Sequence, residues 1–486
     1  MKINNFLLPF LTGLVGIFSF APFSFKFLIF ISYAYLLNIV LNSKDNTFLK
    51  VFCWGVGHWG FGMSWLIVSI YYYGETTIAL SSLIFILLVF ILTIVFTCPI
   101  LFIKPVLRFL KMNHKLHKIL FISALLSINE LSRYYFLNGV PWLIPGSIFL
   151  DTYTQNVYPL FGVSALSFLI YFICTSFIVR NNNKTVFFLL PLIILILIPE
   201  EKSTITKDGI LVSIIQPASD PFLKYEGDYY YQIEANLHRL IEMTSEDSKL
   251  IVIPEAELPY PVNSERFNDF LIKTEKSEKI IMGSWKYEES KLYNSIYSPK
   301  YEESYKKTHL VPFGEYIPFI DNLRGLISFF DLPMSNVSHG NKNQQNITIL
   351  DGIKVSTPIC FDIAFPNTVR NMNKSSLLMI NISNDTWFGN SIGPHYHLAV
   401  TRIRSIENNR WTIRSTNDGI SAFISNKGTI VDYIDKGEST ILEGKVNLID
   451  EDSFYNKMGY LSTYIFLFII VSTTMIWSIW VRFIRS

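Results

Sequence analysis

The sequence predicts an α/β protein with membrane helices, in which a polar domain is inserted before the last of eight transmembrane helices. Charge indicates the division, because residues 1–200 carry only 17 of the 80 Asp, Glu, Lys and Arg side chains of this 486-residue chain. Apolar runs of about 20 residues, the length that crosses a bilayer, fill most of that first part. After it, short β-rich runs alternate with polar helical stretches, which is typical of layered α/β domains.

Eight apolar runs have the length and composition of membrane helices. They lie at roughly 5–22, 24–42, 51–73, 78–103, 118–138, 155–179, 184–199 and 460–481. We therefore expect a seven-helix transmembrane region over residues 1–200 and an eighth helix at 460–481. The first run leads through Ala21-Pro22-Phe23 into another apolar run, which favours a retained helix over a removed signal peptide.

Basic residues predict the orientation of these helices. Lys and Arg gather in alternate loops, five of them between residues 104 and 118, whereas the opposite loops hold essentially Lys26. By the positive-inside rule both termini then lie in the cytoplasm and residues 207–450 on the far side of the membrane. In a bacterium this describes a multi-pass protein of the inner (cytoplasmic) membrane with a periplasmic domain.

The polar domain, residues 207–450, has the texture of strands separated by helices. Its expected strands are Leu211–Gln216, Leu250–Pro254, Lys279–Gly283, Ile347–Leu350, Ile353–Cys360, Leu377–Ile382, Trp411–Ser415, Ile420–Ser425 and Thr429–Ile434. Asp351-Gly352 predicts a hairpin of type I′, and Asn426-Lys427-Gly428 a three-residue hairpin. Residues His395–Asn409 are expected to form a helix after the turn Gly393-Pro394.

Charge and cysteine patterns exclude several classes of protein. A nucleic-acid partner is not expected, since residues 201–486 carry 29 basic against 34 acidic side chains. The four cysteines are far apart and form no CxxC pair, which argues against a disulfide-rich module and a zinc ribbon. A transporter should have buried polar residues in several spans, yet only Glu130 and Arg133 stand out.

Three local sequences place a reactive side chain where a strand gives way to a turn, the usual place for catalytic groups. The first is Ile253-Pro254-Glu255-Ala256-Glu257, in which a strand ends in carboxylates. The second, Tyr305–Glu315, carries two lysines, Lys306 and Lys307. The third, Val355–Asp362, delivers the thiol of Cys360. Composition alone leaves open which glutamate and which lysine would act.

Cys360 differs from the other cysteines in its surroundings. Cys53, Cys98 and Cys174 fall in or near membrane runs, where a small apolar side chain is ordinary. Cys360 alone belongs to a domain in an oxidising compartment, where an unpaired thiol is a liability unless its reactivity is used. Thiolate catalysis needs a base and a cation, which one Glu and one Lys would supply. A buried structural cysteine is the alternative.

The order Glu, Lys, Cys, each at a strand end, resembles the nitrilase superfamily. Longer strings resemble its membrane-embedded branch, the apolipoprotein N-acyltransferases, over nearly the whole chain. These strings are HLVPFGEYIP (309–318), NISNDTWFG (381–389), IRSIENNR (403–410), Ser19–Phe23 and the run from Gly139 to Gly146. The resemblance implies a four-layer αββα sandwich.

The resemblance also implies site residues. Glu255 would be the general base, Lys307 the electrostatic stabiliser and Cys360 the nucleophile. We prefer Glu255 over Glu257 because it directly follows Pro254, and Lys307 because it stands eight residues before Glu315 as in the family. Glu315 would be an additional carboxylate that orients Lys307 or the thiol; a solvated or structural glutamate is the alternative.

Some residues depart from the family pattern or have two interpretations. Phe361-Asp362 stands where the family commonly has Tyr-Glu, so a hydroxyl is lost and the carboxylate is one methylene shorter. Tyr225 stands where the family has Trp, and either stacking or core packing would explain it. Asn384, Asp385 and Trp387 would shape an acyl pocket or merely form an Asx-type turn with a packed indole.

The segment Leu323–Met334 is too apolar for an ordinary surface loop. We interpret it as a lid or membrane-dipping arm that carries Phe329 and Phe330, with a buried satellite cluster as the alternative.

The implied reaction is acyl transfer through a Cys360 thioester, from a membrane phospholipid to the N-terminal diacylglyceryl-cysteine amine of an apolipoprotein. These roles require no metal and no organic cofactor, and we expect a monomer in the lipid bilayer. A membrane-tethered amidase that hydrolyses soluble amides is the alternative enzyme. An acyltransferase would need an apolar, lipid-facing entrance, which Leu323–Met334 favours.

Overall fold

The computed structural model describes residues 4–73, 77–180, 189–200, 207–220, 223–225, 227, 229–312, 314–316 and 337–485. The chain divides into two units. Met1–Tyr71, Thr76–Glu201 and Met458–Ser486 form the first, which we name the helical unit. Tyr72–Glu75 and Lys202–Lys457 form the second, the sandwich unit.

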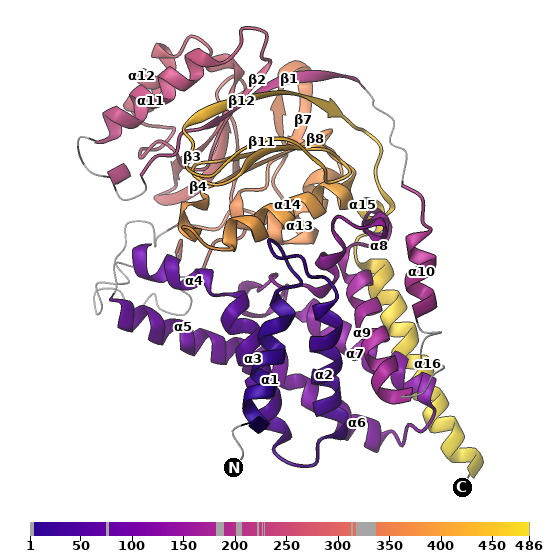
Figure 1. Cartoon of the computed structure of the whole chain (residues 1–486). Helices are drawn as coiled ribbons and strands as arrows, with labels where there is room; N and C mark the ends of the chain where they lie inside the picture. Colours follow the sequence, from indigo (N-terminus) through magenta and orange to yellow (C-terminus); the bar gives the residue numbers. More distant parts are fainter. Residues whose placement is uncertain are drawn as a thin grey trace. The chain divides into compact units, whose positions relative to one another are not determined.

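The helical unit is built from apolar helices (Figure 1). Those described are α1 Asn4–Ile17, α2 Leu28–Asn42, α3 Thr47–Gly62, α4 Trp65–Val68, α5 Ile78–Leu92, α6 Ile103–Phe109, α7 Lys115–Ser132, α8 Tyr158–Phe161, α9 Val163–Arg180, α10 Leu190–Ile196 and α16 Leu461–Arg485. Glycines bring α1 and α3 together, because a Cβ at Gly13 would lie 2.1 Å from the carbonyl oxygen of Trp54. Small residues at such contacts are typical of packed membrane helices.

Two helical stretches among the described residues, Ile78–Phe109 and Leu461–Val481, are long and apolar enough to cross a membrane. A pair bent by 58°, Thr47–Gly62 and Trp65–Tyr71, would be a third if it forms one span. Shorter apolar helices lie at Asn5–Ile17, Leu28–Asn42 and Val163–Val179. Apolar helices are therefore present in the first part of the chain and near its C-terminal end, whereas a total of eight spans stays a prediction.

The sandwich unit contains two sheets of six described strands each (Figure 1). One has the order β12-β1-β2-β3-β4-β5 and the other β11-β10-β9-β8-β7-β6. The strands are β1 Lys207–Gln216, β2 Leu250–Ile253, β3 Ile280–Glu288, β4 Lys291–Ser298, β5 Glu303–Lys306, β6 Ile347–Ile349, β7 Ile353–Ser356, β8 Leu378–Ser383, β9 Thr412–Thr416, β10 Ser421–Ile424, β11 Ile430–Ile434 and β12 Thr440–Leu448. Central strands of both sheets pair in parallel, so their carboxyl ends point the same way within each sheet.

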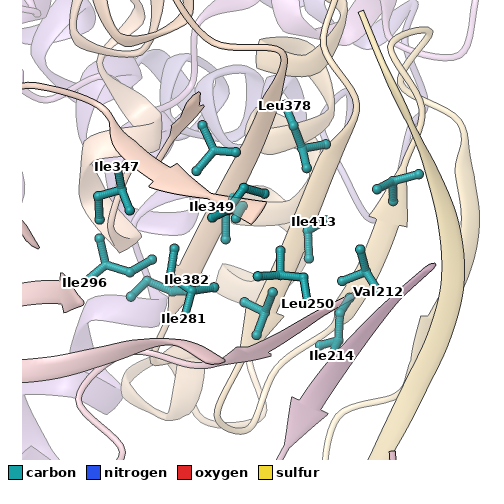
Figure 2. Close-up of a cluster of buried hydrophobic side chains, with 14 of the residues drawn as sticks. Val212, Ile214, Leu250, Ile281, Ile296, Ile347, Ile349, Leu378, Ile382 and Ile413 are labelled. Atoms are coloured by element: carbon teal, nitrogen blue, oxygen red, sulfur yellow. The ribbon is translucent and has the colours of Figure 1, made fainter. Parts of the chain in front are cut away.

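Alternating side chains of these strands make the core between the sheets. Val212 and Ile214 of β1 belong to one buried cluster with Ile382 of β8 and Ile413 of β9, so this cluster includes residues of both sheets (Figure 2). The next residue of β1, Ile215, belongs instead to a cluster on the outer face of its sheet. This period of two is what a strand covered on both faces requires.

Helices cover the outer faces. Helices α11 Tyr229–Met243 and α12 Glu265–Lys273 pack on the first sheet, for example through Leu237 and Phe267. Helices α13 Pro366–Asn373 and α14 Gly393–Asn408 pack on the second, through Val369 and Leu398. A short helix, α15 Phe454–Met458, follows β12. The order of layers is therefore helix, sheet, sheet, helix.

The sequence predicted nine of the strands but missed β4, β5 and β12. The residues of β4 and β12 mix polar and apolar side chains with little apolar run, and β12 pairs with β1, more than 200 residues earlier. Hairpins around Gly352 and Gly428 are present, and these glycines have φ of +79° and +75°. The first is not the predicted type I′ turn, because Ile349 pairs with Ile353 and the three residues between them, Leu350–Gly352, form a 3₁₀ turn. The expected strand Ile353–Cys360 ends at Ser356, because the chain turns before the cysteine.

Candidate active site

Glu255 follows β2 and Pro254, at the carboxyl edge of the first sheet. Gly283 of the neighbouring strand β3 makes room for it, because a Cβ there would lie 2.4 Å from Glu255 Cα. The carboxylate is buried, and its Oε1 accepts hydrogen bonds from Lys307 Nζ at 2.9 Å and from Asn294 Nδ2 at 2.6 Å. Its Oε2 accepts from the backbone N–H of Asn384 at 2.8 Å. Three donors thus hold this carboxylate in one orientation.

Lys307 follows β5 and is buried between two carboxylates. Its Nζ lies 2.9 Å from Glu255 Oε1 and 2.9 Å from Glu315 Oε2. Burial alone would lower the pKa of Lys307, but Glu255 and Glu315 outweigh it and hold the pKa well above its ordinary value. Lys307 is therefore a fixed cation.

Glu315 completes this charge cluster. Its Oε1 accepts from Asn294 Nδ2 at 2.8 Å, and its Oε2 accepts from the backbone N–H of Val311 at 2.8 Å. Asn294, on the missed strand β4, thus bridges both glutamates, and nothing in the sequence around it marks it as a site residue. Glu315 is buried and contacts Lys307, as expected of a carboxylate that orients this lysine, one of the two tasks considered for it.

Cys360 begins the 3₁₀ helix Cys360–Ala364 and is buried beside the core between the sheets. Its φ is +43°, in the left-handed region that residues with a Cβ rarely adopt, and such strain gathers at functional sites. Burial raises the pKa of the thiol, Glu255 raises it further, and Lys307 opposes both. The thiol therefore lies within electrostatic reach of Glu255 and Lys307 and is protonated at rest.

Asp362 ties the Cys360 turn to the segment after Lys307. Its carboxylate accepts from the backbone N–H of His309 at 2.7 Å and of Ile359 at 3.3 Å, and from the hydroxyl of Tyr305 at 3.2 Å. Burial raises the pKa of Asp362 to about 7. The ring of its neighbour Phe361 is buried, with its centroid 5.0 Å from that of Phe365.

The remaining predicted residues have mixed outcomes. Asn384 forms the expected Asx-type turn, since its side chain accepts from the backbone N–H of Thr386 at 3.3 Å, and Trp387 beside it is half-buried. Tyr225 ends the 3₁₀ helix Leu223–Tyr225, and its side chain is outside the described part of the structure. Phe329, Phe330 and the whole segment Leu323–Met334 also lie outside the described residues.

Composition alone could not exclude two alternatives to the site residues, Glu257 and Lys306. In the structure both have other partners. Glu257 is buried with Lys224, whose Nζ lies 3.4 Å from its Oε2, and it also accepts a hydrogen bond from Ser219. Lys306 is partly exposed, with its Nζ 3.0 Å from Glu288 Oε2. The geometry therefore groups Glu255 with Lys307.

This arrangement has the parts for nucleophilic acyl transfer: a thiol on a strained turn, a buried carboxylate and a fixed cation. Among the described residues, no group of three or more His, Cys, Asp or Glu side chains is placed to hold a metal ion.

Comparisons with known proteins match both units. Residues 12–176 match the family described as apolipoprotein N-acyltransferase N-terminal domain, and residues 211–454 match the carbon-nitrogen hydrolase family. An amidase of the nitrilase superfamily from Nesterenkonia aligns with 53% of this chain and 96% of its own, at 15% identity and a TM-score of 0.35.

Curated relatives match over nearly the full length. Apolipoprotein N-acyltransferase from Haemophilus influenzae is 31% identical over 95% of this chain and 93% of its own. That of Pasteurella multocida is 28% identical with the same coverage, and that of Pseudomonas syringae pv. tomato is 32% identical over 88% and 87%. This chain, with a sandwich unit of the carbon-nitrogen hydrolase type and a helical unit of apolar helices, belongs to the apolipoprotein N-acyltransferase family.

Proposed function

We propose that this chain transfers a fatty acyl group from a membrane phospholipid to the N-terminal amine of a diacylglyceryl-cysteine on an apolipoprotein. One observation carries the proposal: Lys307 Nζ lies 2.9 Å from Glu255 Oε1, and both groups act electrostatically on the Cys360 thiol. The names of the relatives support the substrate class.

In the first half-reaction Glu255 takes the proton of the Cys360 thiol. The sulfur attacks the ester carbonyl of the phospholipid, and Lys307 with a backbone N–H near Cys360 stabilises the oxyanion. The ester C–O bond breaks, a C–S bond remains, and the proton on Glu255 passes to the departing lysophospholipid. Because burial raises the pKa of this thiol, the reaction depends on a base held in place, which is what three hydrogen bonds provide for Glu255.

In the second half-reaction the α-amine of the lipid-modified cysteine attacks the thioester. Glu255 accepts the amine proton, a C–N bond forms, and the C–S bond breaks. The proton then returns to the thiolate of Cys360. The product is a triacylated lipoprotein, and the enzyme is back in its starting state.

Both substrates reside in lipid, which suits a catalytic domain attached to membrane helices. In this proposal residues 1–200 and 460–481 form the eight-span region, residues 207–450 form the catalytic domain in the periplasm, and both termini are cytoplasmic. Leu323–Met334 would admit the acyl chain through Phe329 and Phe330. The relatives' names give no support to the alternative of a soluble-amide amidase.

The test is mass spectrometry of the N-terminal peptide of a lipoprotein, from cells with and without this protein. We expect a third acyl chain only when the protein is present. Incubation of the purified protein with phospholipid alone should leave one acyl group on Cys360, released by neutral hydroxylamine. Retained transfer in Cys360→Ala, or acylation of Cys53, Cys98 or Cys174 instead, would contradict the proposed mechanism.

A further inference from the structure

A buried polar network lies next to Cys360, outside the Glu255–Lys307–Glu315 cluster. Its centre is Asp385, the first residue of the 3₁₀ helix Asp385–Phe388. Asp385 Oδ1 accepts from Ser383 Oγ at 2.5 Å and lies 3.0 Å from His397 Nδ1. Asp385 Oδ2 accepts from Arg414 Nη2 at 2.6 Å. All four side chains are buried, so each depends on the others for its hydrogen bonds.

The network contacts the backbone of Cys360. His397 Nε2 lies 3.1 Å from the carbonyl oxygen of that residue. A carbonyl oxygen only accepts, so His397 Nε2 carries the proton that it donates there. The other ring nitrogen, Nδ1, lies against the Asp385–Arg414 pair, 3.0 Å from Asp385 Oδ1 and 3.2 Å from Arg414 Nη2. The ring is thus held on one side by this pair and holds the Cys360 backbone on the other.

Arg414 and helix α14 in turn hold Asp385 and His397 in place. Arg414 Nη1 donates to Asn381 Oδ1 at 2.5 Å and to Thr401 Oγ1 at 3.2 Å. Thr401 stands one helical turn after His397 on α14 and donates to its carbonyl oxygen at 3.0 Å. Strand β9, which carries Arg414, and helix α14 are thereby joined to the turn of the nucleophile.

The conformation of Cys360 makes such support necessary. A residue with a Cβ at φ +43° persists only where its surroundings over-determine the backbone, and the contact from His397 acts on the carbonyl of that same residue. Burial would raise the pKa of Asp385, but Arg414 and His397 bring it well below its ordinary value. Asp385 is therefore a permanent anion and a weak base, which suits an anchor and leaves proton removal to Glu255.

We propose that His397, fixed by Asp385 and Arg414, is a positioning residue that holds the Cys360 turn. This inference rests on Cys360 being the nucleophile of the proposed function. The proposal gives the NISNDTWFG string (381–389) a role in holding the turn that carries Cys360, in addition to forming the Asx-type turn of Asn384.

Two substitutions of His397 test its contact with the Cys360 carbonyl and its contact with Asp385 one at a time. In His397→Gln the side-chain amide nitrogen takes the place of Nε2 and can still donate to the Cys360 carbonyl. In His397→Asn the nitrogen takes the place of Nδ1, which keeps a contact with Asp385 and loses the one with Cys360. Ser405→Ala is the matched control, because Ser405 is buried on the same helix two turns on and hydrogen-bonds to Thr412 at 2.6 Å.

The readout is the rate at which iodoacetamide alkylates Cys360 in the purified full chain, followed by mass spectrometry of the Cys360 peptide, with thermal unfolding as the check on folding. We expect His397→Asn to slow both alkylation and acyl transfer by about 10-fold to 100-fold, the range that misplacement of a reacting group produces, with KM for phospholipid unchanged. His397→Gln should recover most of both rates, and Ser405→Ala should keep them.

Folded His397→Asn that is alkylated at the wild-type rate, or Ser405→Ala that is slowed equally, would overturn the proposal. If the His397 variants do not fold, Ser383→Ala removes only the hydroxyl that donates to Asp385 Oδ1. It should slow alkylation by loosening the support of His397, and an unchanged rate in folded Ser383→Ala would overturn the proposal. Alkylation needs no lipid. A protein that is alkylated as expected but forms no acyl-enzyme would therefore refute the proposed function and leave the positioning role standing.

Discussion

Replacing Lys307 by Met tests the charge cluster directly. Methionine has a similar length and no charge, so it would leave the carboxylates of Glu255 and Glu315 buried with only the amide of Asn294 between them. In the native site each carboxylate has an oxygen 2.9 Å from Lys307 Nζ.

The expected loss of folding stability follows from these distances. Two unit charges 2.9 Å apart interact by about 6 kcal/mol at an effective dielectric constant of about 20. Removing one partner of a buried pair typically costs about 3–5 kcal/mol, because the other charge stays buried. We therefore expect Lys307→Met to lose about 3–5 kcal/mol of stability at pH 8.

The loss of stability in Lys307→Met should depend on pH in a defined direction. Protonation of a carboxyl relieves the unpaired charge, and a free glutamic acid titrates near about pH 4.3. The loss of stability relative to wild type should therefore be smaller at about pH 5 than at about pH 8. Acyl transfer should fall by at least about 10²–10³-fold, as for a deleted oxyanion donor.

The assay is thermal unfolding of the detergent-solubilised protein at pH 5 and pH 8. Lys306→Met is the control, because this neighbouring lysine pairs with Glu288 where both side chains are partly exposed. An exposed pair contributes about 0–1 kcal/mol, so the control should be nearly neutral at both pH values. Equal destabilisation of Lys307→Met at the two pH values, or a matching loss in Lys306→Met, would refute the charge argument.

Three further outcomes follow from the site. Glu255→Gln should lower kcat by about 10²–10⁴-fold, the usual contribution of a general base, whereas Glu257→Gln should mainly lower the melting temperature. Because burial raises the pKa of Asp362 to about 7, its contribution to stability should fall as the pH rises from about 4 to 7, and Asp362→Asn should remove that slope in unfolding measurements. Replacing Phe329 and Phe330 by Ser should slow reaction with a long-chain phospholipid more than with a short soluble ester; equal losses would contradict the lid.

Local sequence determined the chemistry-bearing segments of this protein. Strand-end motifs pointed to Cys360, to a glutamate at 255 or 257 and to a lysine at 306 or 307, and hydrophobic alternation predicted most strands, because both signals are carried by neighbouring residues. The helix over His395–Asn409 was predicted for the same reason and is observed as Gly393–Asn408. Apolar runs likewise predicted the helical unit, since transfer from water to lipid depends on composition.

Tertiary structure decided which of these residues meet. Glu255 and Glu257 are two positions apart, yet one contacts Lys307 and the other Lys224. Composition did not separate the two glutamates, because the partner of a buried charge comes from a distant part of the chain.

The residues that hold the site in place were also set by the fold alone. Asn294 bridges Glu255 and Glu315 from β4, and His397 reaches the Cys360 carbonyl from α14, 37 residues along the chain. Polar side chains of this kind look ordinary in the sequence. Their hydrogen bonds exist only once the two sheets and their helices are packed, because burial removes the competing water and leaves these few partners within reach.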